Sequence, residues 1–239
     1  MKLSKGEYTS MSSKQFHFPA WTDRLTRLLP IIGGVSVLYA VSILAFGASP
    51  ETTDVGYAPK QPVPFSHKLH AGQLKLDCRY CHTTVEEAAH AAIPPTATCS
   101  NCHNPADANG SVATVSVHPN SEKLLKVFES QATGEPIKWE RVHDLPDYAC
   151  FNHSAHVTRG VSCVSCHGRV DQMEVVQQVE PLSMAWCLEC HREPERNLRP
   201  LDKIAQLDWV PEEQPEVIGA RVREELGLAP STNCSTCHR

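Results

Sequence analysis

Hydrophobic and polar positions divide this chain into one long apolar stretch and a remainder without sustained periodicity. Residues 28–50 contain no charged side chain, and these 23 residues suffice to cross a bilayer, which needs about 20 apolar residues. Pro30 falls in the first turn of the helix expected there, where a missing N–H costs little. Further along, the pattern predicts an amphipathic helix across residues 212–228 that ends at Gly227. Elsewhere we expect short helices and loops with little strand.

Charges flank the apolar stretch asymmetrically. Basic residues precede it and acidic residues follow it: Lys14, Arg24 and Arg27, then Glu51 and Asp54. The positive-inside rule therefore predicts a cytoplasmic segment at residues 1–27, a transmembrane helix at 28–50 and an extracytoplasmic domain at 51–239. The alternative is a cleaved signal peptide with its cleavage site near residues 45–47.

Composition indicates that side chains alone make a thin core. The chain has 239 residues, of which 6% are aromatic, and 18 prolines against 12 glycines indicate a loop-rich fold. The formal net charge of −5 argues against nucleic acid as a partner. A basic partner or a membrane neighbour is more consistent with this charge.

Ten of the 11 cysteines form C-x-x-C pairs, each followed at once by a histidine. This is the attachment signature of c-type haem, because two thiols add to the porphyrin vinyl groups and the next residue presents an imidazole to the iron. The motifs are Cys78, Cys81 and His82; Cys99, Cys102 and His103; Cys163, Cys166 and His167; Cys187, Cys190 and His191; and Cys234, Cys237 and His238. We therefore expect five covalent haem c groups with these histidines as proximal ligands.

Structural zinc and a disulfide framework are the alternatives for these cysteines, but neither requires the histidine. By composition alone, a histidine after all five pairs has a chance of about one in two million. Covalent haem attachment takes place outside the cytoplasm, in agreement with the topology from the charges. The odd cysteine, Cys150, is expected to be a small hydrophobic residue near a haem, with a lipidated or redox-active role as the alternative.

An internal repeat supplies candidates for the distal iron ligands. Phe65-Ser-His67-Lys-Leu-His70 and Phe151-Asn-His153-Ser-Ala-His156 each precede two attachment motifs. The chain therefore contains two dihaem modules, residues 65–103 and 151–191, and a fifth haem at 234–238. On a helix, the i, i+3 spacing directs the two imidazoles of a pair to irons on either side.

The repeat resembles that of small bis-histidine tetrahaem cytochromes, which implies a pairing. His67 is expected to bind the iron on His82, and His153 the iron on His167, while His70 and His156 reach other haems. For the fifth iron His143 is favoured. Open alternatives for a distal position are His90, in an expected helix, His118, Met173 and Met184.

Segments between the motifs, over residues 15–239, resemble the pentahaem cytochrome subunit of alternative complex III. These segments are residues 78–86, 93–99, 141–148, 151–157 and 180–191. The resemblance implies a mainly α fold with extensive loops packed around five haems, plus one N-terminal transmembrane helix. It also implies an electron-transfer subunit without a catalytic residue, among polytopic membrane subunits and an iron–sulfur subunit, passing electrons to a monohaem cytochrome or an oxidase. Cys150 departs from the pattern, where a bulky residue is expected.

Two other functions remain open from the sequence. One is a one-span multihaem quinol dehydrogenase that feeds a periplasmic reductase. The other is a terminal reductase with one five-coordinate haem, although seven candidate distal histidines for five irons speak against an open site.

Overall fold

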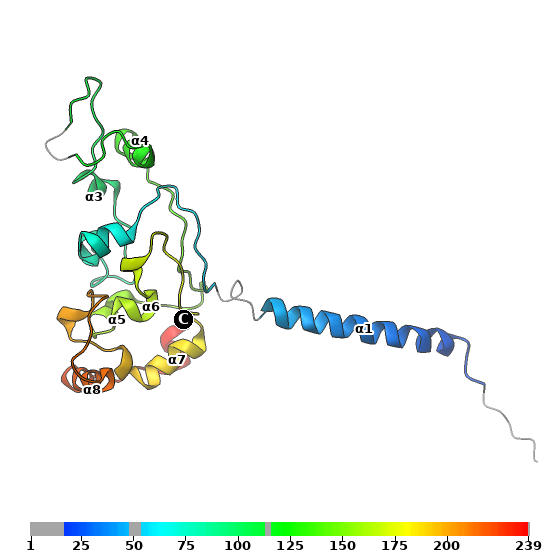
Figure 1. Ribbon diagram of the computed structural model, residues 1–239. Coiled ribbons are helices and arrows are strands. Elements are labelled where there is room, and N and C mark those ends of the chain that lie inside the picture. Colours follow the sequence, from blue (N-terminus) through cyan, green and yellow to red (C-terminus); the bar gives the residue numbers. More distant parts are fainter. Residues whose placement is uncertain (1–16, 48–53, 113–115, 239) are drawn as a thin grey trace, which may run out of the picture. The chain divides into compact units, whose positions relative to one another are not determined.

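The computed structural model describes residues 17–47, 54–112 and 116–238, in two compact units, Met1–Ser49 and Pro50–Arg239. In the first unit, α1 (Trp21–Gly47) is a single helix of 27 residues (Figure 1). The helix begins at Trp21, before the predicted residue 28. Pro30 was expected in the first turn of the helix, but it lies in the helix interior. Residues 48–50 of the predicted span lie outside the described residues.

α1 has the length and composition of a membrane span. Its apolar window has a mean hydropathy of 2.2 and none of it is buried. The hydroxyl of Ser42 donates to the carbonyl of Leu38 at 2.9 Å, so this polar group is satisfied within the helix. A helix that exposes apolar side chains all round suits a lipid environment, and an interior proline is tolerated there.

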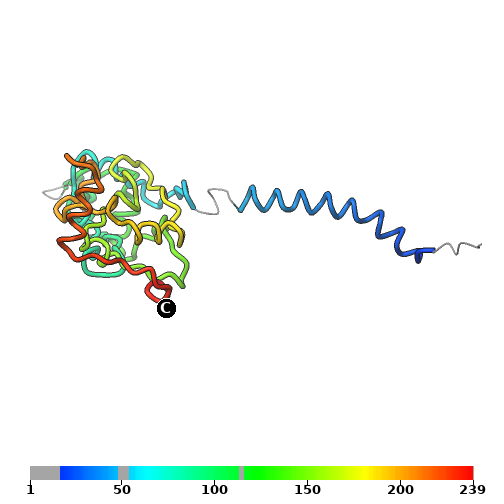
Figure 2. The backbone as a smooth tube through the Cα atoms, turned by 90° about the horizontal axis from the view of Figure 1, so that it is seen from below, coloured from blue at the N-terminus to red at the C-terminus, as the bar shows by residue number. Residues whose placement is uncertain are grey.

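The second unit is built of short helices joined by long loops (Figures 1 and 2). Its α-helices are α2 (Cys78–Cys81), α3 (Thr96–Ser100), α4 (Leu125–Thr133), α5 (His153–Val157), α6 (Cys163–His167), α7 (Met184–Arg192), α8 (Pro215–Glu225) and α9 (Cys234–Cys237). The wider turn η1 (Lys68–Gln73) and the 3₁₀ turns η2 (Glu122–Leu124), η3 (Val170–Gln172), η4 (Pro194–Asn197) and η5 (Leu201–Lys203) lie between them. Within the described ranges no strand occurs, and Val161 and Leu198 form an isolated antiparallel bridge. The expected mainly helical fold is confirmed.

The helix predicted in residues 212–228 is α8, which packs on η4. Ile218 and Val222 on its inner face are buried with Leu198. Gly219 lies so close to the backbone of Glu195 that a Cβ at this position would overlap the Glu195 carbonyl. Arg223 closes the contact with an ion pair to Glu195. The chain turns after α8 at Gly227, whose φ of +60° suits glycine.

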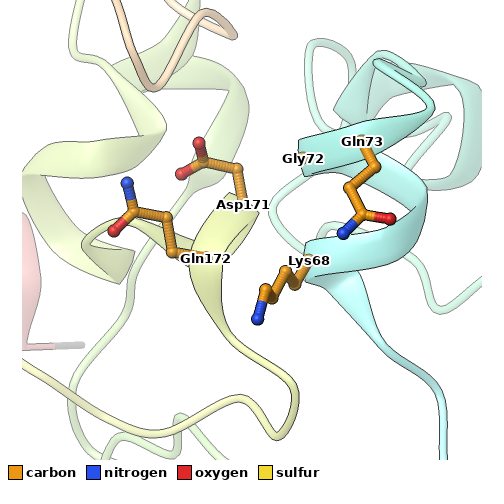
Figure 3. A pocket seen from close by; sticks show the side chains of 5 residues that line it. All are labelled: Lys68, Gly72, Gln73, Asp171 and Gln172. Carbon is orange, nitrogen blue, oxygen red and sulfur yellow. The ribbon is translucent and has the colours of Figure 1, made fainter.

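The two repeats meet where η1 faces η3. Gly72 lies against the carbonyl of Asp171, and the amide of Lys68 donates to the carbonyl of Met173 at 3.0 Å. A shallow hollow of about 470 Å³ lies between these turns, lined by Lys68, Gly72 and Gln73 on one side and Asp171 and Gln172 on the other (Figure 3). The second module is therefore held to the first through backbone contacts.

Few side chains are buried for a unit of this size. The buried hydrophobic residues in the described ranges are Val63, Val127, Val157, Leu198, Ile204, Leu207, Ile218 and Val222, all of them aliphatic. A domain of this length normally buries a far larger apolar surface. The polypeptide thus lacks a side-chain core of its own, as the composition predicts. One local prediction is wrong: the segment around His90 forms turns and bends in place of a helix.

Candidate haem-binding sites

Each C-x-x-C-H motif forms a helical turn that places its histidine over its first cysteine. The amide of His82 donates to the carbonyl of Cys78 at 2.9 Å, and His103 and His238 repeat this bond to Cys99 and Cys234 at 2.8 and 2.9 Å. The other two motifs lie in α6 and α7. The i, i+4 relation brings a thiol and an imidazole to one side of the turn, as the attachment chemistry requires.

Local capping fixes where some of these turns begin. Asp77 precedes α2, and its carboxylate accepts from the amide of Arg79 at 2.8 Å. Ser183 precedes α7 and accepts from the amide of Trp186 at 3.3 Å. Asn152 caps α5 in the same way, so the His153 and His156 pair starts directly after a cap.

Most histidines of the site share one hydrogen-bonding pattern: Nδ1 contacts a backbone carbonyl, which leaves Nε2 unused. Among the motif histidines, His82 contacts Ala92, His103 contacts Val117, His191 contacts Ser231 and His238 contacts Tyr148, at 2.7–3.0 Å. Among the repeat histidines, His70, His153 and His156 contact Ser66, Ala89 and Asn152 at 2.7–2.9 Å. Such a bond fixes the tautomer and ring orientation of a metal-binding imidazole. These residues therefore suit iron ligation through Nε2.

Three repeat histidines face motif histidines at one spacing. The ring centroids of His70 and His103 are 6.2 Å apart, those of His153 and His167 6.4 Å, and those of His156 and His191 6.1 Å. With metal–nitrogen bonds of about 2 Å, two imidazoles on opposite sides of one metal hold their centroids about 6 Å apart. The donor set in this structure fits haem iron at each pair, and the spacing is too wide for direct ring packing.

His67 and His82 lie in each other's electrostatic field. Burial lowers the pKa of His67 to about 4, with smaller contributions from the nearby His82 and His70. The Nδ1 atom of His67 is buried and has no hydrogen-bond partner within the described residues. A buried polar nitrogen without a partner is costly, so ligation at the other nitrogen gives this histidine a reason to be buried.

His143, the residue predicted for the fifth distal position, lies at the third motif. Its Nε2 is 3.3 Å from Nδ1 of His167, and the structure does not bring it to His238. Burial lowers the pKa of His143 and of His167, the latter to about 3. The ring that contacts His238 is that of Tyr148, with centroids 5.9 Å apart. Sequence reasoning missed Tyr148, and no motif pointed to it.

The other candidates occupy varied places. Met184, at the start of α7, is exposed, and so are His90 and Cys150. Met173 is half-buried, and its carbonyl accepts the hydrogen bond from Lys68 that joins the modules. His118 is exposed, with a φ of +58°. The amide of Cys150 donates to the carbonyl of Cys237 at 2.7 Å. Cys150 therefore lies beside the fifth motif, and its expected role as a small hydrophobic residue near a haem stays a prediction.

Cysteines of different motifs approach one another in a fixed spatial order. Cys81 of the first motif lies in the electrostatic field of Cys99 of the second, and the thiols of Cys78 and Cys163 lie close enough to shift each other's pKa. Further along, Cys166 of the third motif lies near Cys187 and Cys190 of the fourth, and Cys187 lies near Cys237 of the fifth. The motifs are thus neighbours in the order second, first, third, fourth and fifth.

The competing chemistries find little support in this geometry. None of the 11 cysteines is joined to another by a disulfide. Across the described ranges, no group of three or more His, Cys, Asp or Glu side chains is arranged to hold a metal ion, as a structural zinc site needs. Burial raises the pKa of several thiols, that of Cys166 to about 12, which disfavours thiolate ligands.

Comparison with known proteins defines the class. Residues 149–239 match the family described as cytochrome c7 and related cytochrome c, and residues 47–132 match the class III cytochrome C family. The two matches assign multihaem cytochrome c domains to these two segments, and cytochrome c families imply haem c as the cofactor.

A curated relative narrows the comparison. Over 140 residues the chain is 34% identical to the multihaem cytochrome c subunit of menaquinone reductase from Nitratidesulfovibrio vulgaris, strain Hildenborough. The match covers 56% of this chain and 60% of that subunit, so the chain spans less than two thirds of the relative.

Proposed function

We propose that this chain binds five haem c groups, one on each C-x-x-C-H motif, and relays electrons among them. The spatial order of the motifs is the observation that carries the proposal. Each motif has a cysteine beside a cysteine of the next motif in that order. Groups attached at these thiols lie next to one another, so an electron passes from one end of the domain to the other in short steps.

The chain's residues set up each centre. The haem iron, when bound, supplies reversible one-electron oxidation and reduction. His82, His103, His167, His191 and His238 would hold the irons as proximal ligands, and His67, His70, His153 and His156 would serve as four distal ligands. Two protein ligands exclude water and substrates from an iron, which favours electron transfer over catalysis. Carbonyl acceptors on Nδ1 fix the orientation of seven of these nine rings, while Nδ1 of His167 contacts His143 and Nδ1 of His67 has no partner within the described residues.

The paired geometry supports a crossed assignment within each module. His67 and His70 belong to one turn, yet they face His82 of the first motif and His103 of the second. His153 and His156 likewise face His167 and His191. One short helical segment therefore ties two haems together in each module.

We further propose that α1 anchors this domain to the membrane, with the N-terminus in the cytoplasm and the haem domain in the periplasm or its equivalent. The chain would then work inside a quinol-oxidising complex of the alternative complex III type, beside polytopic subunits and an iron–sulfur subunit. Electrons would leave to a monohaem cytochrome or an oxidase. The apolar surface of α1 and the resemblance of the segments between motifs support this role.

A second candidate rests on the relative, whose name is that of a menaquinone reductase subunit. In such a complex electrons would move through the haems toward the quinone pool. A one-span quinol dehydrogenase that feeds a periplasmic reductase is supported to a similar degree. All three functions use the same haem relay and differ in the partner and in the direction of flow.

Purification from membranes with the chain tagged at its C-terminus tests these functions. An iron–sulfur subunit and polytopic proteins should co-purify, and a quinol should reduce the haems of the complex rapidly in stopped flow. The chain alone should not react with quinol. Reduction of the isolated chain by quinol would favour the dehydrogenase, and fast oxidation of pre-reduced haems by menaquinone alone would favour the reductase. A soluble chain without partners would contradict the proposal.

A further inference from the structure

His143 contacts the third proximal histidine from the side. Its Nε2 lies 3.3 Å from Nδ1 of His167, and the two rings are nearly perpendicular, at 81°, with centroids 4.4 Å apart. This separation is too short for a metal between the rings, which needs about 6 Å. The distal side of His167 is already faced by His153, whose ring is parallel to it. His143 is therefore not placed as a ligand of that iron.

The contact is unusual among the motif histidines. Nδ1 of the other four faces a backbone carbonyl, whereas Nδ1 of His167 faces a side chain. With Nε2 of a neutral imidazole on the iron, Nδ1 must carry the proton and donate it. His143 must then accept through a bare Nε2, with its own proton on Nδ1. One tautomer of each ring satisfies both conditions.

We propose that His143 is a positioning residue that orients His167 and lowers the reduction potential of the third haem. An acceptor on Nδ1 draws the proton away from the ring and makes the imidazole a stronger donor to iron, which stabilises the oxidised state. An imidazole nitrogen replaces the carbonyl oxygen used at the other motifs. This inference rests on the proposed haem relay.

The place of the third motif gives this control a purpose. Cys163 adjoins Cys78 of the first module, and Cys166 adjoins both cysteines of the fourth motif. Electrons that cross between the modules pass through the third haem. A residue that sets the reduction potential of the third haem therefore sets the driving force for electron transfer between the modules.

Two variants of the full chain test the proposal. His143→Leu removes the acceptor, and His143→Gln offers an amide oxygen in its place. The readouts are a spectroelectrochemical titration and electron paramagnetic resonance of the oxidised protein, which do not depend on quinol activity. His17→Leu, at an exposed histidine of the first unit that is not a candidate ligand, is the matched control.

We expect His143→Leu to raise the midpoint of one haem. The ratio of oxidised to reduced iron at a fixed potential should change about tenfold, the lower end of second-shell effects, which for one electron is about 59 mV. Every low-spin signal should persist, His143→Gln should restore most of the shift, and His17→Leu should show none. Unchanged midpoints in His143→Leu would overturn the proposal, and so would a new high-spin iron, because that identifies His143 as a distal ligand. If the leucine variant loses haem, the glutamine variant decides: it must keep all haems and a near-normal midpoint, and a lost haem or a shifted midpoint in it rejects the role.

Discussion

The imidazole rings of His153 and His167 are parallel to within 5°, and their centroids are 6.4 Å apart. No protein atom bonds these rings to each other, yet each is fixed through Nδ1, to the carbonyl of Ala89 and to His143. The polypeptide thus holds two nitrogen ligands apart at the spacing of an axial pair. The first module therefore positions His153, the distal ligand proposed for the third haem, because Ala89 lies between the first two motifs.

Replacing His153 should open one iron. We expect His153→Ala to keep every covalent haem, since attachment uses cysteines, but to convert one low-spin iron to high spin. Loss of an imidazole should also raise the potential of that haem. Electron paramagnetic resonance and a haem assay of the purified variant measure both effects. His17→Ala, in the first unit, serves as control. A fully low-spin His153→Ala protein would rule out this pair.

The partners of His70 and His156 can be told apart by removing a haem. His70→Ala should create one high-spin iron, but it should create none in a chain whose second haem is removed by Cys99→Ala and Cys102→Ala. His156→Ala should still create one in that same background, because its partner is His191. Resonance spectra of the combined variants check this. If His70→Ala still gives a high-spin signal without the second haem, the His70–His103 pairing is wrong.

The contact of α8 with η4 should be sensitive to one methyl group. Gly219→Ala forces a Cβ into the carbonyl of Glu195, and overpacking of this kind costs about 1–3 kcal/mol. Thermal unfolding of the haem-loaded protein should show a lower midpoint. Gly33→Ala in α1 is the matched control, since nothing lies within 4 Å of its new Cβ. Equal midpoints for the two variants would show that this packing is looser than described.

Acid should destabilise the haem domain through its buried histidines. Burial lowers the pKa of His67 to about 4 and of His167 to about 3, from 6.5. Below pH 6.5 the unfolded chain therefore binds protons that the folded chain does not. The stability from these neutral rings is complete above that pH and is lost as pH falls through the two lowered values. Iron ligation acts in the same direction.

Unfolding midpoints recorded from neutral pH downward test this. The unfolding midpoint should fall progressively as the pH drops below 6.5. Once the pH is below the lowered pKa values of His67 and His167, these two histidines should cause no further fall. A midpoint that stays constant through the whole acid range would mean that these histidines bind protons equally in the folded and unfolded chains, so that their pKa is not lowered by folding.

Much of this fold follows from the sequence because the signals are local. The C-x-x-C-H motifs predict their own helical turns. The uncharged residues 28–50 predict most of α1. The helix predicted near His90 does not form, because helix propensity alone does not stabilise a short helix that lacks a packed face. In this segment the backbone carbonyl of Ala89 contacts Nδ1 of His153 and is not part of a helix.

The site was predictable in its proximal half only. Spacing places a histidine after each cysteine pair, whereas distal partners depend on contacts between segments that are far apart in the chain. The repeat still predicts four distal partners, because i, i+3 spacing sends two rings in different directions, and these four assignments stay predictions. The position of His143 beside His167 has no local signal, since 24 residues separate the two.

The number of haems is the most direct test of the account. Intact mass spectrometry of the chain purified from a host that attaches haem should show the polypeptide plus five haem groups. A pyridine haemochrome assay should give five per chain, and the oxidised spectrum should be dominated by low-spin iron. A colourless chain, or one whose paired cysteines hold zinc or disulfides, would contradict it.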